Sequence, residues 1–287
     1  MASLIVSEHG KTKQEALAEI EKGNETVEYA ISLPQLFAGD ILNVSRGVVC
    51  RDFRVPHGVC VSIVPFNFPF MVPMWTLPIA VACGNTFILK PSEKVPCTMT
   101  FAMSLLKEAG FPEGVVNMVH GTSEVVQQLC DHPKVKAVSF VGTTHVARLL
   151  YNRCTLLHKR VLCLGGAKNH MVAAPDCDIE LTASDVVASF SGCSGQRCMA
   201  ASVLLTIGDQ QKLIDCIVKK ASAILPGQDK INREHRMGPV IDEQSLSKIL
   251  MYINESEAGG AKILLDGRSW SNKTPKSPTK KIKESIG

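Results

Sequence analysis

Residues 58–157 alternate short apolar runs with segments whose apolar residues recur at helical spacing. The first run, residues 58–65, is rich in β-branched side chains and is typical of a buried strand. Similar runs predict strands at 86–89, 115–119 and 137–141, and helical patterns occupy the intervals at 73–82, 98–109, 123–130 and 144–157. This alternation predicts an α/β fold, with a Rossmann-type parallel sheet and helices on both of its faces.

Shorter patterns flank this region. Residues 11–33 carry apolar positions at near-helical spacing, so we expect an amphipathic helix that breaks near Gly23-Asn24. Residues 38–55 change to alternating positions around Gly39 and Gly47, which favours a hairpin. Towards the C-terminus we expect a strand at 202–207, helices at 211–225 and 246–253, and a last short strand at 262–266.

Composition narrows the class of protein. The chain has 287 residues, 45% hydrophobic and 20% charged, a balance typical of soluble globular domains. Its formal charge of +4 comes partly from five lysines after residue 272, so the rest is nearly neutral and no nucleic-acid partner is expected. Prolines interrupt the longest apolar window, 59–89, so no membrane span is expected. Residues 1–10 show no transit peptide or other targeting signal.

The eleven cysteines are scattered and odd in number, without CxxC pairs or a neighbouring histidine pair at zinc-ligand spacing. We therefore expect reduced thiols in an intracellular compartment and no metal site. Cys198 differs from the others because it ends a turn of small residues directly after Arg197. A thiol reacts as thiolate, which requires partial exposure and a positive field. On these residues alone, Cys198 is either a nucleophile or, like most cysteines, a small buried hydrophobe.

Three of the predicted strands end in polar or small residues, at 65–67, 90–93 and 142–144. In a parallel sheet, ligands bind outside the carboxyl ends of the strands. Lys90 and Glu93 have the chemistry to bind ribose hydroxyls, while Gly142 and Thr143 suit a phosphate at a helix N-terminus. The alternative is that these are loop residues and helix caps of an ordinary α/β domain.

Longer motifs make the chain resemble the aldehyde dehydrogenase superfamily. They lie, in family order, at residues 65–69, 84–93, 139–142 and 195–198. Residues 166–170 and 198–200 are more specifically similar to the CoA-acylating methylmalonate-semialdehyde dehydrogenases. The resemblance runs from about Leu4 to Arg268.

The resemblance implies roles for individual residues. Cys198 would attack the aldehyde to form a thiohemiacetal, and Asn67 with the backbone N–H of Cys198 would hold the oxyanion. Hydride would pass to NAD, leaving a thioester that CoA accepts as co-substrate. Arg197 and Lys22 stand where the family has two arginines that bind the substrate carboxylate. The positions that match the NAD site are Val64, Phe66, Lys90, Glu93, Lys94, Gly142 and Thr143.

Some positions depart from the family pattern. Leu164 stands where hydrolytic members carry a glutamate and the CoA-dependent ones an asparagine, so a thiol acceptor is favoured over water. Lys22 offers a point charge in place of a bidentate guanidinium. Cys193 and Ser194 replace the usual alanines. Cys193 is either a small filler in a packed turn or an oxidation partner for Cys198.

The resemblance also predicts the domain organisation. It implies an NAD-binding domain at 1–165 with an oligomerisation hairpin near 38–55, an incomplete α/β catalytic domain at 166–270 and a disordered basic tail at 271–287. The alternative for that tail is a basic nucleic-acid arm. Relatives begin upstream of Met1 and continue past Arg268, so we expect a chain shortened at both ends.

Two hypotheses follow. The first is an enzyme that converts a small-molecule semialdehyde, malonate or methylmalonate semialdehyde, to acyl-CoA with NAD, in valine and in pyrimidine (thymine) catabolism. Its family implies a mitochondrial homo-oligomer, a tetramer. The second is a catalytically impaired remnant that binds NAD or pairs with full-length subunits through the 38–55 hairpin.

Overall fold

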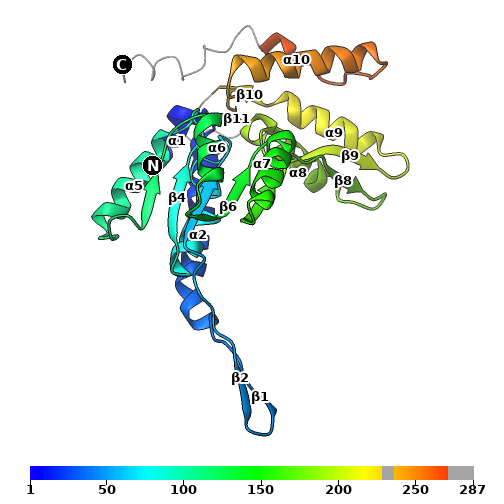
Figure 1. Cartoon of the computed structure of the whole chain (residues 1–287). Helices are drawn as coiled ribbons and strands as arrows, with labels where there is room; N and C mark the ends of the chain where they lie inside the picture. Colours follow the sequence, from blue (N-terminus) through cyan, green and yellow to red (C-terminus); the bar gives the residue numbers. More distant parts are fainter. Residues whose placement is uncertain (228–235, 271–287) are drawn as a thin grey trace, which may run out of the picture. The chain divides into compact units, whose positions relative to one another are not determined.

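The computed structural model describes residues 1–227 and 236–270 (Figure 1). The chain forms two compact units, the first made of Met1 and Ala18–Gly166 and the second of Ala2–Leu17 with the residues from Ala167 on. The change at 166/167 lies one residue from the expected boundary. Residues 2–17 were expected in the first domain but group with the second unit, where Glu15 binds the backbone of Cys193. The tail expected at 271–287 lies outside the described residues.

A five-stranded parallel sheet forms the centre of unit 1, in the order β5-β4-β3-β6-β7. The strands are β3 (Val59–Ile63), β4 (Thr86–Lys90), β5 (Val116–Met118), β6 (Val135–Val141) and β7 (Arg160–Leu164). All four neighbouring pairs are parallel, which confirms the predicted α/β fold. The edge strand β7 was not expected from the sequence, because its half-exposed side chains follow two basic residues and give only a short apolar run.

Helices cover the sheet on both faces. α6 (Ser123–Asp131) and α7 (Thr144–Leu156) pack on one face, where Cys130, Leu150 and Cys154 join strand residues in one core cluster. α3 (Met71–Met74), α4 (Leu77–Ala82) and α5 (Cys97–Glu108) lie in the connections from β3 to β4 and from β4 to β5. These connections step along the parallel sheet in the direction opposite to those that contain α6 and α7. Because parallel crossovers are right-handed, these three helices lie on the other face.

The helix expected at 73–82 is wrong in one respect, since it is two helices separated at Trp75-Thr76. Pro78 stands at the start of α4. Proline has no N–H to continue a preceding helix, and its ring would clash with the carbonyl four residues earlier. The chain therefore begins a new helix at that point.

α1 (Ala2–His9) and α2 (Lys13–Leu36) precede the sheet. α1 was not expected, and the predicted break near Gly23-Asn24 is wrong because α2 continues through it. A Cβ at Gly23 would lie 2.6 Å from Cε1 of Phe70. Gly23 therefore lets the Phe70 ring pack against the helix backbone, and this packing offsets the roughly 1 kcal/mol that glycine costs inside a helix.

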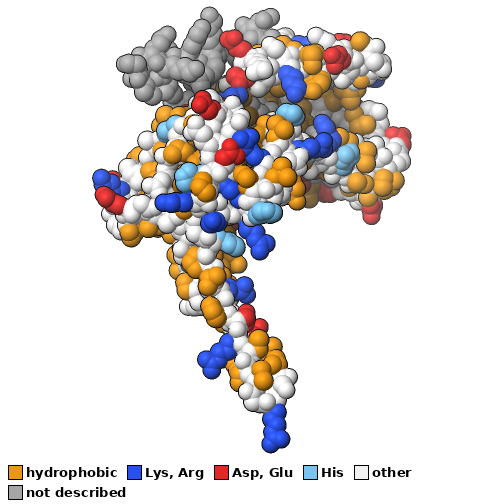
Figure 2. Space-filling model, viewed as in Figure 1, with side chains coloured by type: hydrophobic (Ala, Val, Ile, Leu, Met, Phe, Trp, Pro, Cys, Tyr) orange, Lys and Arg blue, Asp and Glu red, His pale blue; other side chains and the backbone are white. Residues whose placement is uncertain are grey.

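The expected hairpin is confirmed as β1 (Ile41–Ser45) and β2 (Val48–Arg51), an antiparallel pair that projects from unit 1 (Figure 1). Gly47 takes the positive φ that its tight turn requires. Every residue of both strands is exposed. Figure 2 shows hydrophobic side chains along the hairpin, among them Ile41, Leu42, Val44, Val48 and Val49.

Unit 2 is built around a parallel pair of strands, β8 (Asn169–Ala173) and β9 (Ala201–Thr206). α8 (Ile179–Ser191) and α9 (Gln211–Ser222) pack on them around Ala173, Ala183 and Leu213. The 3₁₀ helix η1 (Gly192–Gly195) follows α8 directly. The unit also contains the short parallel pair β10 (Leu225–Pro226) and β11 (Arg236–Met237) and the helix α10 (Glu243–Ala258).

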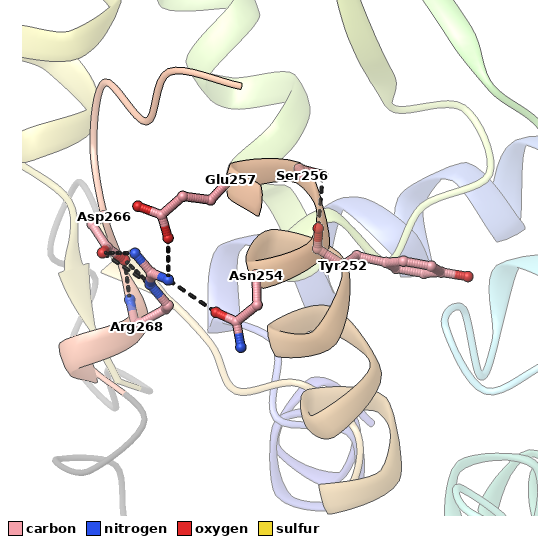
Figure 3. A network of polar contacts seen from close by, with 6 residues as sticks. All are labelled: Tyr252, Asn254, Ser256, Glu257, Asp266 and Arg268. Atoms are coloured by element: carbon pink, nitrogen blue, oxygen red, sulfur yellow. Dashed lines mark hydrogen bonds and ion pairs between the residues drawn. The ribbon is translucent and has the colours of Figure 1, made fainter. Parts of the chain in front are cut away.

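The strand expected at 262–266 is wrong. Ile263, Leu264 and Leu265 line a hollow with side chains of α10 and form no ladder with another strand among the described residues. Arg268, in the 3₁₀ helix η2 (Arg268–Trp270), fixes this segment through ion pairs with Glu257 at 2.8 Å and Asp266 at 2.7 Å (Figure 3). In the described ranges, the structure contains no helix of the length and hydropathy that a membrane crossing needs.

Candidate active site

The order of the strands locates a ligand-binding edge in unit 1. β4 and β5 lie on one side of β3, whereas β6 and β7 lie on the other. The carboxyl ends of β3 and β6 therefore flank the topological switch point, where open α/β sheets bind their ligands. Val64 and Phe66 follow β3, and Gly142 and Thr143 follow β6. The fold thus brings these four predicted cofactor residues to one edge.

Lys90 ends the neighbouring strand β4, and its Nζ lies 3.0 Å from Oε2 of Glu93. The lysine side chain is 6% exposed, while that of Glu93 is 54% exposed. Burial opposes ionisation of Glu93, but hydrogen bonds from its own backbone N–H and from Lys90 hold its pKa below the ordinary value. The pair presents a buried cation and an accessible carboxylate, which suits the hydroxyls of a ribose. The Lys94 ammonium lies 5.3 Å from the centroid of the Phe66 ring.

Gly142 and Thr143 form the N-terminus of α7. Thr143 is the N-cap, with its Oγ1 accepting the Val146 N–H at 3.4 Å. A Cβ at Gly142 would overlap the ring of Phe140, so the position admits only a bare backbone. The helix dipole and the bare backbone favour an anion such as a diphosphate. Together with Lys90 and Glu93, this arrangement fits the dinucleotide expected from the sequence.

Leu164 ends β7 beside the same edge and is 40% exposed. Its carbonyl accepts the Gly142 N–H at 3.1 Å. The Gly166 N–H donates to Oγ1 of Thr144 at 3.0 Å, which fixes the following turn. The strand end therefore presents an apolar side chain and contributes no carboxylate of its own.

A cavity of about 950 Å³ also lies in unit 1, along the starts and middles of β3, β6 and β7. Its lining includes Trp75, Arg160 and Leu162. None of the predicted cofactor residues lines it. The cavity is therefore distinct from the predicted cofactor residues at the carboxyl ends of the strands.

Cys198 lies in unit 2, in the turn between η1 and β9, and is partly buried. Its carbonyl accepts a hydrogen bond of 2.7 Å from Nδ2 of Asn169, which also donates to the Ala200 carbonyl at 3.2 Å. Asn169 begins β8 and was not expected among the site residues. Asn169 is part of the 166–170 motif, but it contacts a residue 29 positions away in the sequence, which the motif does not predict.

Arg197 was expected to bind a substrate carboxylate. One of its guanidinium nitrogens donates to the carbonyls of Ala188 and Ser189, at 2.7 and 3.0 Å, near the end of α8. A Cβ at Gly192 would overlap this guanidinium. The observed contacts are those of a helix C-terminal cap. Whether Arg197 also binds substrate stays a prediction.

The other expected site residues belong to unit 1. Asn67 follows β3, before α3. Lys22 lies on the exposed face of α2 and pairs with Glu25 at 2.7 Å. Arg197 and Cys198 belong to unit 2, so the pairing of Asn67 with Cys198 and that of Lys22 with Arg197 stay predictions.

All eleven cysteines are free thiols, and Cys193 is buried. Among residues 1–227 and 236–270, no three His, Cys, Asp or Glu side chains are grouped so as to hold a metal ion.

Comparison with known proteins supplies the family. The model of the aldehyde dehydrogenase family matches residues 1–279. The chain belongs to this family. Malonate-semialdehyde dehydrogenase 1 from Oceanobacillus iheyensis is 43% identical over 277 residues, which are 96% of this chain and 57% of that protein.

Solved structures agree with the sequence relatives. Methylmalonate-semialdehyde dehydrogenase from Oceanimonas doudoroffii gives a TM-score of 0.90 at 41% identity, over 93% of this chain and 55% of that one. A protein from Sinorhizobium meliloti assigned as a methylmalonate-semialdehyde dehydrogenase and complexed with NAD gives 0.91 at 38% identity, with the same coverage. This member of the aldehyde dehydrogenase family therefore spans little more than half the length of the relatives that it matches.

Proposed function

We propose that this chain oxidises a short carboxylated semialdehyde, malonate or methylmalonate semialdehyde, with NAD and delivers the acyl group to CoA. The observation that carries the proposal is the partly exposed Cys198, held by Asn169 on a fixed turn. The named relatives support the substrate class, and the NAD complex of one neighbour supports the cofactor.

In the proposed reaction the Cys198 thiolate attacks the aldehyde carbon. The developing oxyanion accepts hydrogen bonds from the backbone N–H of Cys198 and from the Asn67 amide, which the family resemblance assigns. One such donor is worth about 3–4 kcal/mol of transition-state stabilisation. NAD, when bound, accepts the hydride, and a thioester remains on Cys198.

The edge residues of unit 1 bind the cofactor in this proposal. Lys90 and Glu93 bind ribose hydroxyls, and the Gly142 backbone with Thr143 receives the diphosphate at the N-terminus of α7. Val64, Phe66 and Lys94 line the proposed NAD site next to these residues. Each of these roles is tested by replacing the residue and measuring NAD affinity.

CoA is proposed as the acyl acceptor because Leu164 offers no general base to activate water. A thiol such as CoA ionises far more readily than water, so its attack depends less on a general base. The substrate carboxylate is proposed to bind Arg197 and Lys22. Since Lys22 pairs with Glu25 in the free chain, the substrate must displace Glu25 to reach it.

Assembly is proposed to use the projecting hairpin. Its two strands expose apolar side chains along their whole length, more than an isolated hairpin keeps stable in water. A homo-oligomer, a tetramer by family resemblance, would cover them. Mitochondrial location and a place in valine and pyrimidine catabolism rest on the resemblance alone.

A second candidate function is a partner subunit without turnover. It is favoured by Leu164 and Lys22, which depart from the family pattern at two positions of the proposed site. Such a chain would bind NAD or pair with full-length subunits.

The deciding experiment is NADH formation by the purified chain with NAD and each semialdehyde, with and without CoA. Cys198→Ala is the control. Steady turnover that requires both CoA and Cys198 supports the enzyme. A folded chain that binds NAD without forming NADH contradicts it and leaves the partner subunit.

A further inference from the structure

The turn that precedes Cys198 is strained. Cys193 and Ser194 both adopt the left-handed region, with φ of 50° and 55° and ψ of 30° and 38°. Residues other than glycine rarely adopt this backbone conformation, because it brings their Cβ atom close to the following carbonyl oxygen. Such residues persist only where the surrounding structure holds them, and they concentrate at functional sites.

Glu15 holds this turn from a distant part of the sequence. Its Oε1 accepts the backbone N–H of Cys193 at 2.7 Å, a contact between residues 178 positions apart. A charged acceptor makes this hydrogen bond stronger than a neutral one. The contact lies on the first of the two strained residues.

The Glu15 side chain is itself fixed. Its Oε2 accepts the N–H and the hydroxyl of Thr12, at 2.8 and 2.9 Å, and the Glu15 N–H donates back to Oγ1 of Thr12 at 3.3 Å. These reciprocal bonds form a capping box at the start of α2. One carboxylate oxygen therefore closes the helix N-terminus, and the other is aimed at the turn.

Neutral contacts complete the support. Gln196 donates to the Cys193 carbonyl at 2.8 Å and accepts the Ile241 N–H at 3.0 Å, while the Ser194 hydroxyl donates to the Gly238 carbonyl. A Cβ at Gly238 would overlap the Gly10 carbonyl. The segment before α2 therefore packs directly on the residues that support the turn.

We propose that Glu15 is a positioning residue for the nucleophile: by holding the Cys193 N–H it maintains the left-handed turn and thereby the exposure and direction of the Cys198 thiol. Glu15 acts only through the backbone of the turn. The proposal rests on the proposed function in one respect, the assignment of Cys198 as nucleophile.

The test follows the rate at which iodoacetamide alkylates individual cysteines, read by peptide mass mapping. Glu15→Ala removes both acceptors, and Glu15→Gln keeps the shape but turns an amide N–H₂ towards one of the donors. We expect either variant to slow alkylation of Cys198 by about tenfold, the scale of one charge-assisted hydrogen bond. Exposed Cys50, in the hairpin of unit 1, is the internal standard whose rate stays constant.

Glu28→Ala, on the exposed face of the same helix, is the matched control and should leave both rates unchanged. If Glu15→Ala does not fold by circular dichroism, Glu15→Gln decides. A folded Glu15 variant whose Cys198 reacts at the wild-type rate overturns the proposal. Because alkylation needs neither NAD nor aldehyde, a chain without turnover still tests the role of Glu15, so failure of the two proposals is distinguishable.

Discussion

The side-chain amide of Asn169 donates to the main-chain carbonyl of Cys198 at 2.7 Å and thereby links the start of β8 to the residue proposed as nucleophile. The same nitrogen donates to Ala200, so it spans both ends of the short turn.

Asn169→Asp should therefore disorder the cysteine turn. An ionised carboxylate cannot donate and repels both carbonyls, so we expect the free energy of unfolding to fall by about 1–3 kcal/mol. Urea denaturation measures the free energy of unfolding, and a change in the alkylation rate of Cys198 reports the disorder of the turn. Asn117→Asp is the control, since its amide donates to Gly114 in an exposed turn of unit 1. Equal stabilities of the two variants would refute the contribution of Asn169.

Gly142→Ala should weaken NAD binding. The added methyl would overlap the Phe140 ring, which is buried, so the ring or the Gly142 backbone must shift beside the position proposed for the diphosphate. We expect at least about a tenfold loss of affinity, measured by isothermal titration calorimetry. Gly267→Ala is the control because a Cβ there meets open space. An unchanged affinity in Gly142→Ala would remove this end of the sheet as the cofactor edge.

His9 should make the protein sensitive to acid. Burial, and secondly the charge of Lys11, lower the pKa of His9 from 6.5 to about 3. The unfolded chain therefore binds a proton at a pH where the native state does not, so the contribution of neutral His9 is complete above pH 6.5 and is lost as the pH falls towards 3.

Replacing this histidine tests the linkage. His9→Asn keeps an acceptor for the Lys11 N–H, which His9 Nδ1 accepts at 3.2 Å, but it cannot titrate. We expect the unfolding free energy of the variant to depend less on pH between 6.5 and 3, by an amount on the order of a few kcal/mol over that window. Parallel pH profiles of wild type and variant would contradict the prediction. His120→Asn, at an exposed position, is the control.

The hairpin should determine the oligomeric state. Leu42 and Val44 are 60% and 59% exposed, so replacing both with aspartate leaves the fold of unit 1 intact while charging the apolar surface. We expect the double variant to shift to monomer in size-exclusion chromatography with light scattering. Asn43→Asp, between the two positions, adds a charge on the other side of the strand and serves as control. An oligomer that survives the double variant would place the interface elsewhere.

The alternation of apolar runs and helical patterns was sufficient to predict the parallel sheet, because strand and helix periodicities are local properties of the chain. It also located Lys90, Gly142 and Thr143 at strand ends, since a strand and the residue that follows it are continuous in sequence. The same local reasoning failed at Gly23, where a glycine that should break a helix is compensated by the Phe70 ring. It failed again at Ile263–Leu265, whose apolar side chains line a hollow with α10 and do not belong to a strand.

The support of the proposed nucleophile could not be predicted from the sequence. The turn is strained locally, and its stability comes from Glu15, Asn169 and Ile241, which lie 178, 29 and 45 residues from the groups they contact. The sequence by itself determined the α/β fold, the strand-end residues and the cysteine, because each depends on neighbours along the chain. Tertiary structure alone decided how that cysteine is held, because hydrogen bonds across such separations exist only after the chain has folded.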